Sequence, residues 1–197
     1  MEITFVKMHG NGNDFILIDE YEKTVIPDEM KPQFAQLYCD RRFGIGADGV
    51  LYLSRSGSAD LKMRLFQPDE SEAPMCGNGI RCFAKYAFDT GYVEKSCTVE
   101  TMAGIISVVM DYTDDTFLAT IQMPEPRFNR ADIPATGEGE YRETIEGYMV
   151  YAVNTGVPHA VIFVEDPASF PLIEIGPAIR HHASFSEGAN VNIVKRE

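Results

Sequence analysis

The sequence lacks the long apolar runs and the basic clusters that would place a protein in a membrane or on nucleic acid. No stretch approaches the roughly 18 apolar residues of a membrane-spanning helix, and the start, MEITFVKMHG, has no apolar core of a signal peptide. The 17 lysines and arginines are outnumbered by 30 aspartates and glutamates, so the formal charge is −13. This charge repels phosphate backbones. We therefore expect a cytoplasmic protein that binds neither nucleic acid nor a membrane.

Cysteine is scarce, and its spacing favours neither a metal site nor a disulfide framework. Cys39, Cys76, Cys82 and Cys97 form no CxxC pair and lie far from the histidines, so a zinc signature is missing. In a reducing compartment we expect four thiols. For Cys39, Cys82 and Cys97 we expect the role of small buried hydrophobic residues.

The first half of the chain alternates predicted strands and helices. A helix is expected over 27–41, and a second one begins after Cys76 and ends near Gly91, a good C-terminal stop. The expected strands cover 3–7, 15–19, 50–53, 61–66, 96–101, 105–111 and 116–123. The last three are predicted to form an antiparallel meander.

A proline- and charge-rich segment, PEPRFNRADIPATGEGE, begins at Pro124 and is the best linker candidate. We therefore predict an N-terminal domain over 1–123, which carries the Cys76 loop, and a partial second domain over 124–197. A similar order of elements restarts after the linker. Strands are expected over 148–154, 160–164 and 190–195, with a helix over 172–182.

The two halves form a weak internal repeat. GNDFILID and GVPHAVIFVED occupy the same place in each half, and IGADG corresponds loosely to SEGAN. Cys76 follows Gly12 by a fixed number of positions. The same number of positions counted forward from Gly156 ends beyond Glu197. If the repeat is real, the second half stops before its own counterpart of the cysteine loop. The chain is therefore expected to be truncated at its C-terminus.

The stretch PMCGNGIRCFAKYA places a thiol directly before a glycine-flanked turn and a buried helix. Unpaired N–H groups at a helix start, together with the helix dipole, attract an anion such as a carboxylate. The glycines on either side of Asn78 let the backbone approach a ligand closely. The same field favours the thiolate over the thiol at Cys76. This loop can hold an anion beside a group suited to general acid–base work.

Three other roles for Cys76 remain open at this point. It could be a nucleophile, with His9 or His159 as its base. It could be a redox-sensing thiol, or a structural residue in a simple turn. The loop HGNGND clusters polar side chains as a ligand site would, although Asn-Gly is also common in β-hairpins. His159, after the rigid Pro158, is more often a hydrogen-bonded structural residue at such a place.

Several motifs, in order along nearly the whole chain, resemble diaminopimelate epimerase, a lysine-pathway enzyme that interconverts L,L- and meso-diaminopimelate without a cofactor. The motifs are MHGNGNDFILID, RRFGIGADGVLYL, MRLFQPDESEAPMCGNGIRCFAKYA, TGVPHAVIFVED and ANVNIVK. The resemblance implies an α/β (α+β) fold of two pseudo-symmetric domains, each a curved, mostly antiparallel sheet around a central helix. It also implies an active site between the domains, a homodimer, and neither cofactor nor metal.

Carried over position by position, Cys76 resembles one of the family's two catalytic cysteines, and His159 resembles the histidine that supports catalysis. The implied mechanism uses two bases: one thiolate removes the α-proton from one face, and the other thiol delivers a proton to the opposite face. The substrate-binding residues that the resemblance implies are Asn13, Gln67, Gly77, Asn78 and Asn190.

Three departures from the family pattern affect this expectation. Gln67 stands where many relatives have Asn, and Val157 stands where many have Asn before Pro-His, so no binding role is carried over to Val157. The family's second cysteine loop, and the Glu-Arg pair before it, are absent. The 197-residue chain alone is therefore expected to be inactive. The alternatives are another cofactor-independent isomerase of the superfamily, such as a proline racemase-like or phenazine-biosynthesis-like enzyme, and a non-catalytic binding module that has lost the second base.

Overall fold

The computed structural model describes residues 2–114, 116–123 and 125–196. The chain divides into two compact units, 1–122 and 123–197, and each is described by itself. In the described part of the chain, no helix is both long and apolar enough to cross a membrane.

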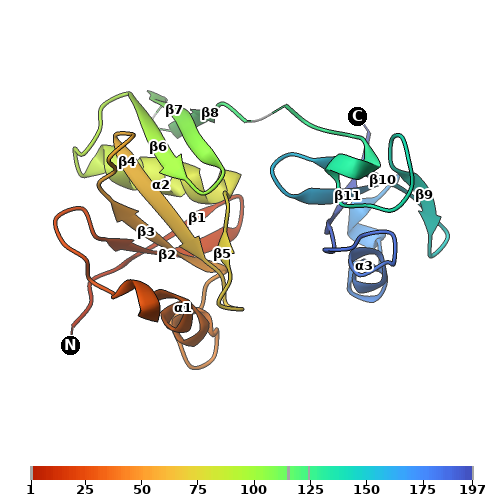
Figure 1. Cartoon of the computed structure of the whole chain (residues 1–197), viewed down its shortest axis with the longest axis horizontal. Helices are drawn as coiled ribbons and strands as arrows, with labels where there is room; N and C mark the ends of the chain where they lie inside the picture. The colour runs from red at the N-terminus through yellow and green to blue at the C-terminus, as the bar shows by residue number, and fades with distance from the viewer. Residues whose placement is uncertain (1, 115, 124, 197) are drawn as a thin grey trace. The chain divides into compact units, whose positions relative to one another are not determined.

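The first unit is a curved, mostly antiparallel sheet with two helices (Figure 1). Its strands are β1 (Val6–Gly10), β2 (Asn13–Asp19), β3 (Gly49–Ser54), β4 (Leu61–Phe66), β5 (Glu72–Ala73), β6 (Ser96–Thr101), β7 (Gly104–Thr113) and β8 (Thr116–Ile121). The sheet order is β1-β2-β3-β4-β6-β7-β8, with β5 paired to β4. The pairs β2–β3 and β4–β6 are parallel, and the other pairs are antiparallel. The predicted meander is β6–β8.

The central strands are buried on both faces, because a helix covers each face. In β2, Phe15 and Leu17 pack into the core around helix α2 (Gly77–Asp89), whereas Ile16 and Ile18 pack with helix α1 (Lys31–Cys39). This explains the continuous apolar run FILI in place of a polar alternation. Since α2 contacts both β1 and β8, the two outer strands, the sheet curves around this helix.

Two predicted elements of the first unit differ most from the observed ones in their bounds or type. The first strand begins at Val6, not at residue 3, and it extends to Gly10, which pairs with Asn13 across the turn at Asn11 and Gly12. Both turn residues have positive φ, as a two-residue hairpin turn requires. The predicted helix over 27–41 is a 3₁₀ turn, η1 (Asp28–Met30), followed by α1. It ends early because the Asp40 carboxylate accepts hydrogen bonds from the backbone amides of Arg42 and Phe43.

The second unit is a four-stranded sheet with one helix. Its strands lie in the order β12 (Asn190–Val194), β11 (Pro158–Phe163), β10 (Tyr148–Asn154) and β9 (Arg142–Ile145), and the pair β11–β12 is parallel. Helix α3 (Leu172–Arg180) packs Ile179 onto Val150 and Ile162 of the sheet. Strand β9 was not predicted. The short turns η2 (Arg130–Asp132) and η3 (Pro167–Ser169) complete this unit.

The weak repeat in sequence corresponds to a shared topology. In the first unit, the β1–β2 hairpin leads through α1 to β3, which pairs parallel to β2. In the second unit, the β10–β11 hairpin leads through α3 to β12, which pairs parallel to β11. The order hairpin, helix and parallel strand is therefore common to both units.

Candidate active site

Cys76 is the N-cap residue of α2. Its backbone is extended (φ −141°, ψ 117°), and its sulfur accepts a hydrogen bond from the Gly79 amide at 3.4 Å. The sulfur thus takes the place that a serine or aspartate oxygen takes in most N-caps. The residue is half-buried, whereas the three other cysteines are buried. Cys76 is therefore the thiol to which a ligand from solvent has access.

Two backbone amides beside this thiol are free to bind an anion. The amides of Gly77 and Asn78 open the helix, and they have no acceptor among the described residues. A Cβ atom on Gly77 would meet only open space and the far end of Arg81, so a ligand can approach this backbone closely. The first turn of α2 therefore forms a small anion site next to the sulfur.

Gly79 has a different role from the one expected for a ligand-facing glycine. It is buried, and a Cβ atom there would lie 3.4–3.5 Å from Cys76, Leu51 and Phe15. At Gly10 of β1, a Cβ atom would lie 3.2 Å from the Asn78 carbonyl oxygen. Gly10 therefore lets the β1–β2 hairpin and the first turn of α2 pack closely, whereas a Cβ atom on Gly79 would make ordinary van der Waals contacts.

Three asparagine side chains meet at the start of α2. The Asn11 amide nitrogen donates to Asn78 Oδ1 at 3.1 Å. Asn13 Oδ1 lies 3.6 Å from the Cys76 sulfur and 3.5 Å from Asn78 Nδ2. The structure therefore brings together Asn13, Cys76 and Asn78, which lie far apart in the sequence.

A charged network lies behind Asn13. Asn13 Nδ2 donates to Asp48 Oδ2 at 2.7 Å, and Arg41 bridges Asp48 and Asp14 with contacts of 2.8 and 2.7 Å. Lys7 also donates to Asp14. The Arg41 and Lys7 side chains hold the pKa of the Asp14 carboxyl well below its usual range. Both carboxylates are therefore paired with cations.

Gln67 is not joined to this cluster by a hydrogen bond among the described residues. It follows β4, and its side-chain amide donates to Ser71 Oγ at 3.0 Å. The backbone amide of Gln67 bonds to the Ser71 carbonyl, which closes the turn that leads to β5 and then to Cys76. Its side chain is exposed.

His159 and Asn190 lie in the second unit and face each other across the parallel pair β11–β12. His159 Nδ1 lies 3.0 Å from Asn192 Nδ2. Since an amide NH₂ can only donate, Nδ1 accepts and the neutral ring carries its proton on Nε2. Burial lowers the pKa of His159, which also favours the neutral ring. Asn190 Oδ1 accepts a hydrogen bond from Arg180 at 3.2 Å.

Burial raises the pKa of the three other thiols to about 11. These cysteines, Cys39, Cys82 and Cys97, are only 3–5% exposed. They are the small buried residues that the sequence predicted. Among the described residues, no group of histidines, cysteines and carboxylates is suited to hold a metal ion.

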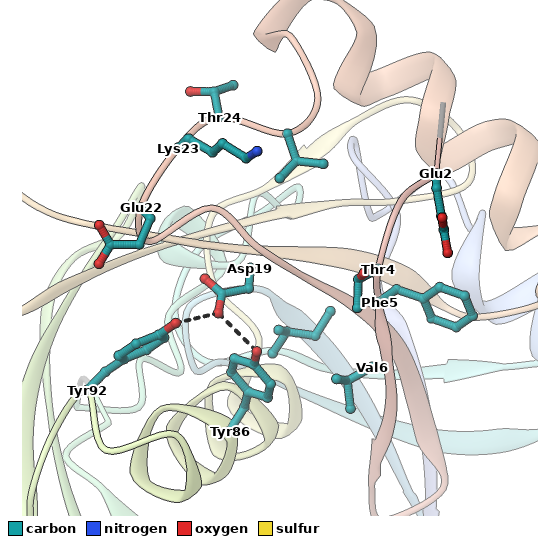
Figure 2. Close-up of a pocket in the computed structure, with 12 residues that line it drawn as sticks. Glu2, Thr4, Phe5, Val6, Asp19, Glu22, Lys23, Thr24, Tyr86 and Tyr92 are labelled. Carbon is teal, nitrogen blue, oxygen red and sulfur yellow. Dashed lines mark hydrogen bonds between the residues drawn. The ribbon is translucent and has the colours of Figure 1, made fainter.

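A cavity of about 580 Å³ lies elsewhere in the first unit and contains none of the predicted site residues. Figure 2 shows Asp19 accepting hydrogen bonds from Tyr86 and Tyr92, at 2.9 and 2.7 Å. Burial and the bond to Asp19 raise the pKa of Tyr86 to about 12. This arrangement fastens the end of α2 to β2, and we assign it no part in the candidate site.

Sequence reasoning missed the residues that orient the predicted ones. Asp48 and Arg41 lie in the loop RRFGIGADG, which was noted only as a motif, and Asn192 was not singled out. A signal for Asp48 was available, because it lies in a glycine-rich loop just before the strand expected over 50–53. Its link to Asn13 depends on the parallel pairing of β2 and β3, which the sequence alone did not establish.

Comparison with protein families and curated relatives gives one consistent result. The sequence model for the family described as "Diaminopimelate epimerase" matches residues 5–128. The chain is 54% identical over 195 residues to the diaminopimelate epimerase of Methanothrix thermoacetophila, with 98% of this chain and 70% of that protein covered. It is 51% identical to that of Methanocella arvoryzae, with 100% and 71% covered.

Solved structures show the same fold at low sequence identity. A phenazine biosynthesis protein of the PhzF family from Bacillus anthracis matches with a TM-score of 0.65 at 17% identity, covering 99% of this chain and 67% of that one. A probable proline racemase from Agrobacterium radiobacter matches with the same TM-score at 13% identity, covering 100% and 67%. These likenesses confirm the predicted fold class.

Proposed function

Because the chain belongs to the diaminopimelate epimerase family, we propose that it carries the first half of a two-base epimerase site acting on diaminopimelate in lysine biosynthesis. Cys76 is the proton-transfer group of this half. The observation that supports this most directly is the half-buried sulfur at the N-terminus of α2, beside two amides with no protein acceptor among the described residues.

The proposed substrate contact is an α-carboxylate on the Gly77 and Asn78 amides. This anchoring would hold the α-carbon near the sulfur, as general acid–base catalysis requires. The thiolate would take the α-proton, so that the C–H bond breaks, an S–H bond forms and the electron pair stays on the substrate. The pair delocalises into the carboxylate, whose developing charge the two amides and the helix dipole stabilise.

The second proton transfer needs an acid on the opposite face of the α-carbon. The other three thiols of this chain are buried in the first unit, and the sequence has no cysteine after Cys97. We therefore propose that the 197-residue chain by itself does not invert the α-carbon. His159, Asn190 and Gln67 are proposed to support or contact the substrate, and their placement around it remains a prediction.

The competing assignments make different predictions. A proline racemase-like or phenazine-biosynthesis-like activity has support only from fold likeness at 17% identity or less, whereas the epimerase assignment has relatives at 51–54% identity. A non-catalytic module would leave Cys76 without proton-transfer chemistry.

The family also implies a homodimer, which light scattering of the purified protein would test.

The test uses the natively expressed protein, whose intact mass is recorded, with L,L-diaminopimelate in D₂O. If the recorded mass exceeds that of the 197 residues and the additional segment carries a cysteine, we expect deuterium at the α-carbon together with formation of the meso isomer. For the 197-residue chain alone we expect no meso isomer. Cys76→Ser should lower the rate by at least about 1,000-fold, because the hydroxyl is a far weaker acid than the thiol. Cys82→Ala is the matched control on the same helix and should keep the rate within about threefold. Unchanged exchange in Cys76→Ser would refute the assignment.

A further inference from the structure

We propose that Asp48 is a positioning residue for Cys76: its carboxylate fixes the Asn13 amide so that the carbonyl oxygen, and not the NH₂ group, faces the thiol. The importance of this for catalysis rests on the proposed function of Cys76. The geometric claim can be tested without any substrate.

The hydrogen bonds to Asp48 determine which way the Asn13 amide points. Asp48 Oδ2 accepts from Asn13 Nδ2 at 2.7 Å and from the Asp14 backbone amide at 3.0 Å. An ionised carboxylate can only accept, so it must face the NH₂ group of Asn13. The other end of the amide, Oδ1, is then directed to Cys76 Sγ, 3.6 Å away, and to Asn78 Nδ2.

Asp48 is itself held firmly. Its backbone amide donates to the Asp14 carbonyl at 2.9 Å, while its side chain accepts from the Asp14 amide. Arg41 Nη2 contacts Asp48 Oδ1 at 2.8 Å and also binds Asp14. The side chain of Asp48 is 44% exposed, so its substitution does not disturb the core. The Asp48 backbone, Asp14 of β2 and the Arg41 side chain together hold the carboxylate that orients Asn13.

The orientation matters because a proton-transfer thiol must exist in two forms. The S–H form can donate to Asn13 Oδ1, and the thiolate can accept from the Gly79 amide. If the Asn13 amide turned over, its NH₂ group would face the sulfur. The Asn13 NH₂ group and the Gly79 amide would then both donate to the sulfur and favour the thiolate. The protonated form would lose its hydrogen-bond acceptor. Asp48 therefore keeps an acceptor for the S–H form in place, opposite the Gly79 amide that serves the thiolate.

Charge offers a competing explanation that the experiment must exclude. The charged groups near this site are Lys7 and Asp14 on the β1–β2 hairpin, Arg41 and Asp48 on the loop before β3, and Arg81 on α2. Removing the negative charge of Asp48 would by itself favour the thiolate. A variant that removes the charge but keeps the acceptor separates the two effects.

The experiment measures the rate of iodoacetamide alkylation of Cys76 against pH, by mass spectrometry of the Cys76 peptide from the folded protein. In Asp48→Ala, Asn13 loses its acceptor, and we expect the midpoint pH to fall by about one unit. Asp48→Asn is the matched control. Two donors, from Asn13 and Asp14, converge on one position and hold the oxygen of the substituted amide there. Its NH₂ group then faces Arg41, whose exposed side chain can turn away while it keeps its bonds to Asp14, so we expect a fall of no more than about 0.3 unit. Equal shifts in both variants, or none in Asp48→Ala, would overturn the proposal.

A second arm asks whether Asp48 acts through Asn13. In an Asn13→Ala background, adding Asp48→Ala should move the midpoint by no more than about 0.2 unit, because the amide to be oriented is gone. A full shift in this background would overturn the proposal. If Asp48→Ala fails to fold by circular dichroism, Asp48→Ser is used, since its short hydroxyl cannot reach Asn13. A natively expressed protein that carries a further cysteine beyond these 197 residues, shows the expected midpoint shifts and yet does not epimerise diaminopimelate would refute the proposed function and leave this inference standing.

Discussion

The four thiols of this chain should differ sharply in reactivity, and the structure allows the difference to be estimated. The folded protein is treated with iodoacetamide at pH 8. Cys76 lies half-buried at a helix N-terminus, whereas Cys39, Cys82 and Cys97 are buried with pKa values of about 11. Because only the thiolate reacts, we expect Cys76 to be alkylated first.

The magnitude follows from the ionised fractions. At pH 8, an ordinary thiol with a pKa of about 8.5 is ionised to about one quarter, and a thiol with a pKa of about 11 to about one part in 1,000. That is a difference of about 200-fold. A more basic thiolate is intrinsically about 10-fold more nucleophilic over this range, which leaves a net factor of about 20. Exclusion of the reagent from the core slows the buried thiols further.

The assay quenches the reaction at intervals, digests the protein and quantifies each cysteine peptide. We expect Cys82 to react at least about 20-fold more slowly than an ordinary model thiol such as glutathione, and Cys76 to react at a rate close to that of the model thiol or faster. In 8 M urea all four should react at similar rates. Equal rates for Cys76 and Cys82 in the folded protein would refute the reasoning from the helix terminus and from burial.

Two further predictions concern stability. Lys31 and Glu20 form a buried ion pair at 2.9 Å, with side chains only 3% and 5% exposed. Lys31→Met should therefore lower the free energy of unfolding by about 3 kcal/mol in urea titration, because it leaves the buried Glu20 charge without its ion-pair partner. The double variant Lys31→Met with Glu20→Gln should recover part of this loss, and no recovery would contradict the explanation. Burial lowers the pKa of His159 in the folded state, so the unfolded state binds the proton more readily and stability should fall as the pH drops below about 6.5. His159→Gln should reduce that slope, as measured by thermal unfolding between pH 5 and 7.5, and an unchanged slope would show that other groups cause it.

The hydrogen bonds of Cys76 connect the proposed chemistry to the fold. One partner, the Gly79 amide, comes from the helix that Cys76 caps, and the other, Asn13, comes from the β1–β2 hairpin. The hairpin approaches this closely at Gly10, where a Cβ atom would lie 3.2 Å from the Asn78 carbonyl oxygen. A substitution at Gly10 would therefore displace Asn13 from the sulfur before it affected the helix.

Much of the fold and part of the candidate site could be predicted from local sequence. The hairpin at Asn11-Gly12, the cap at Cys76 and the meander after Gly91 follow from short-range turn and capping chemistry, which depends on few neighbours. The motifs around CGNG were specific enough to indicate the family. The burial of Cys39, Cys82 and Cys97 also followed from composition, since a thiol packs as a small apolar group.

The tertiary structure decided what lies beside the sulfur and how it is held. The parallel pairing of β2 with β3 places Asp48 against Asn13, although 35 residues separate them in sequence. Likewise, β11–β12 pairing places Asn190 opposite His159, and it brings Asn192 to the ring. Parallel partners are chosen by packing across long connections, and no local pattern encodes the choice. The sequence by itself therefore indicated candidate groups for the site, and only the folded sheet decided which residues orient them.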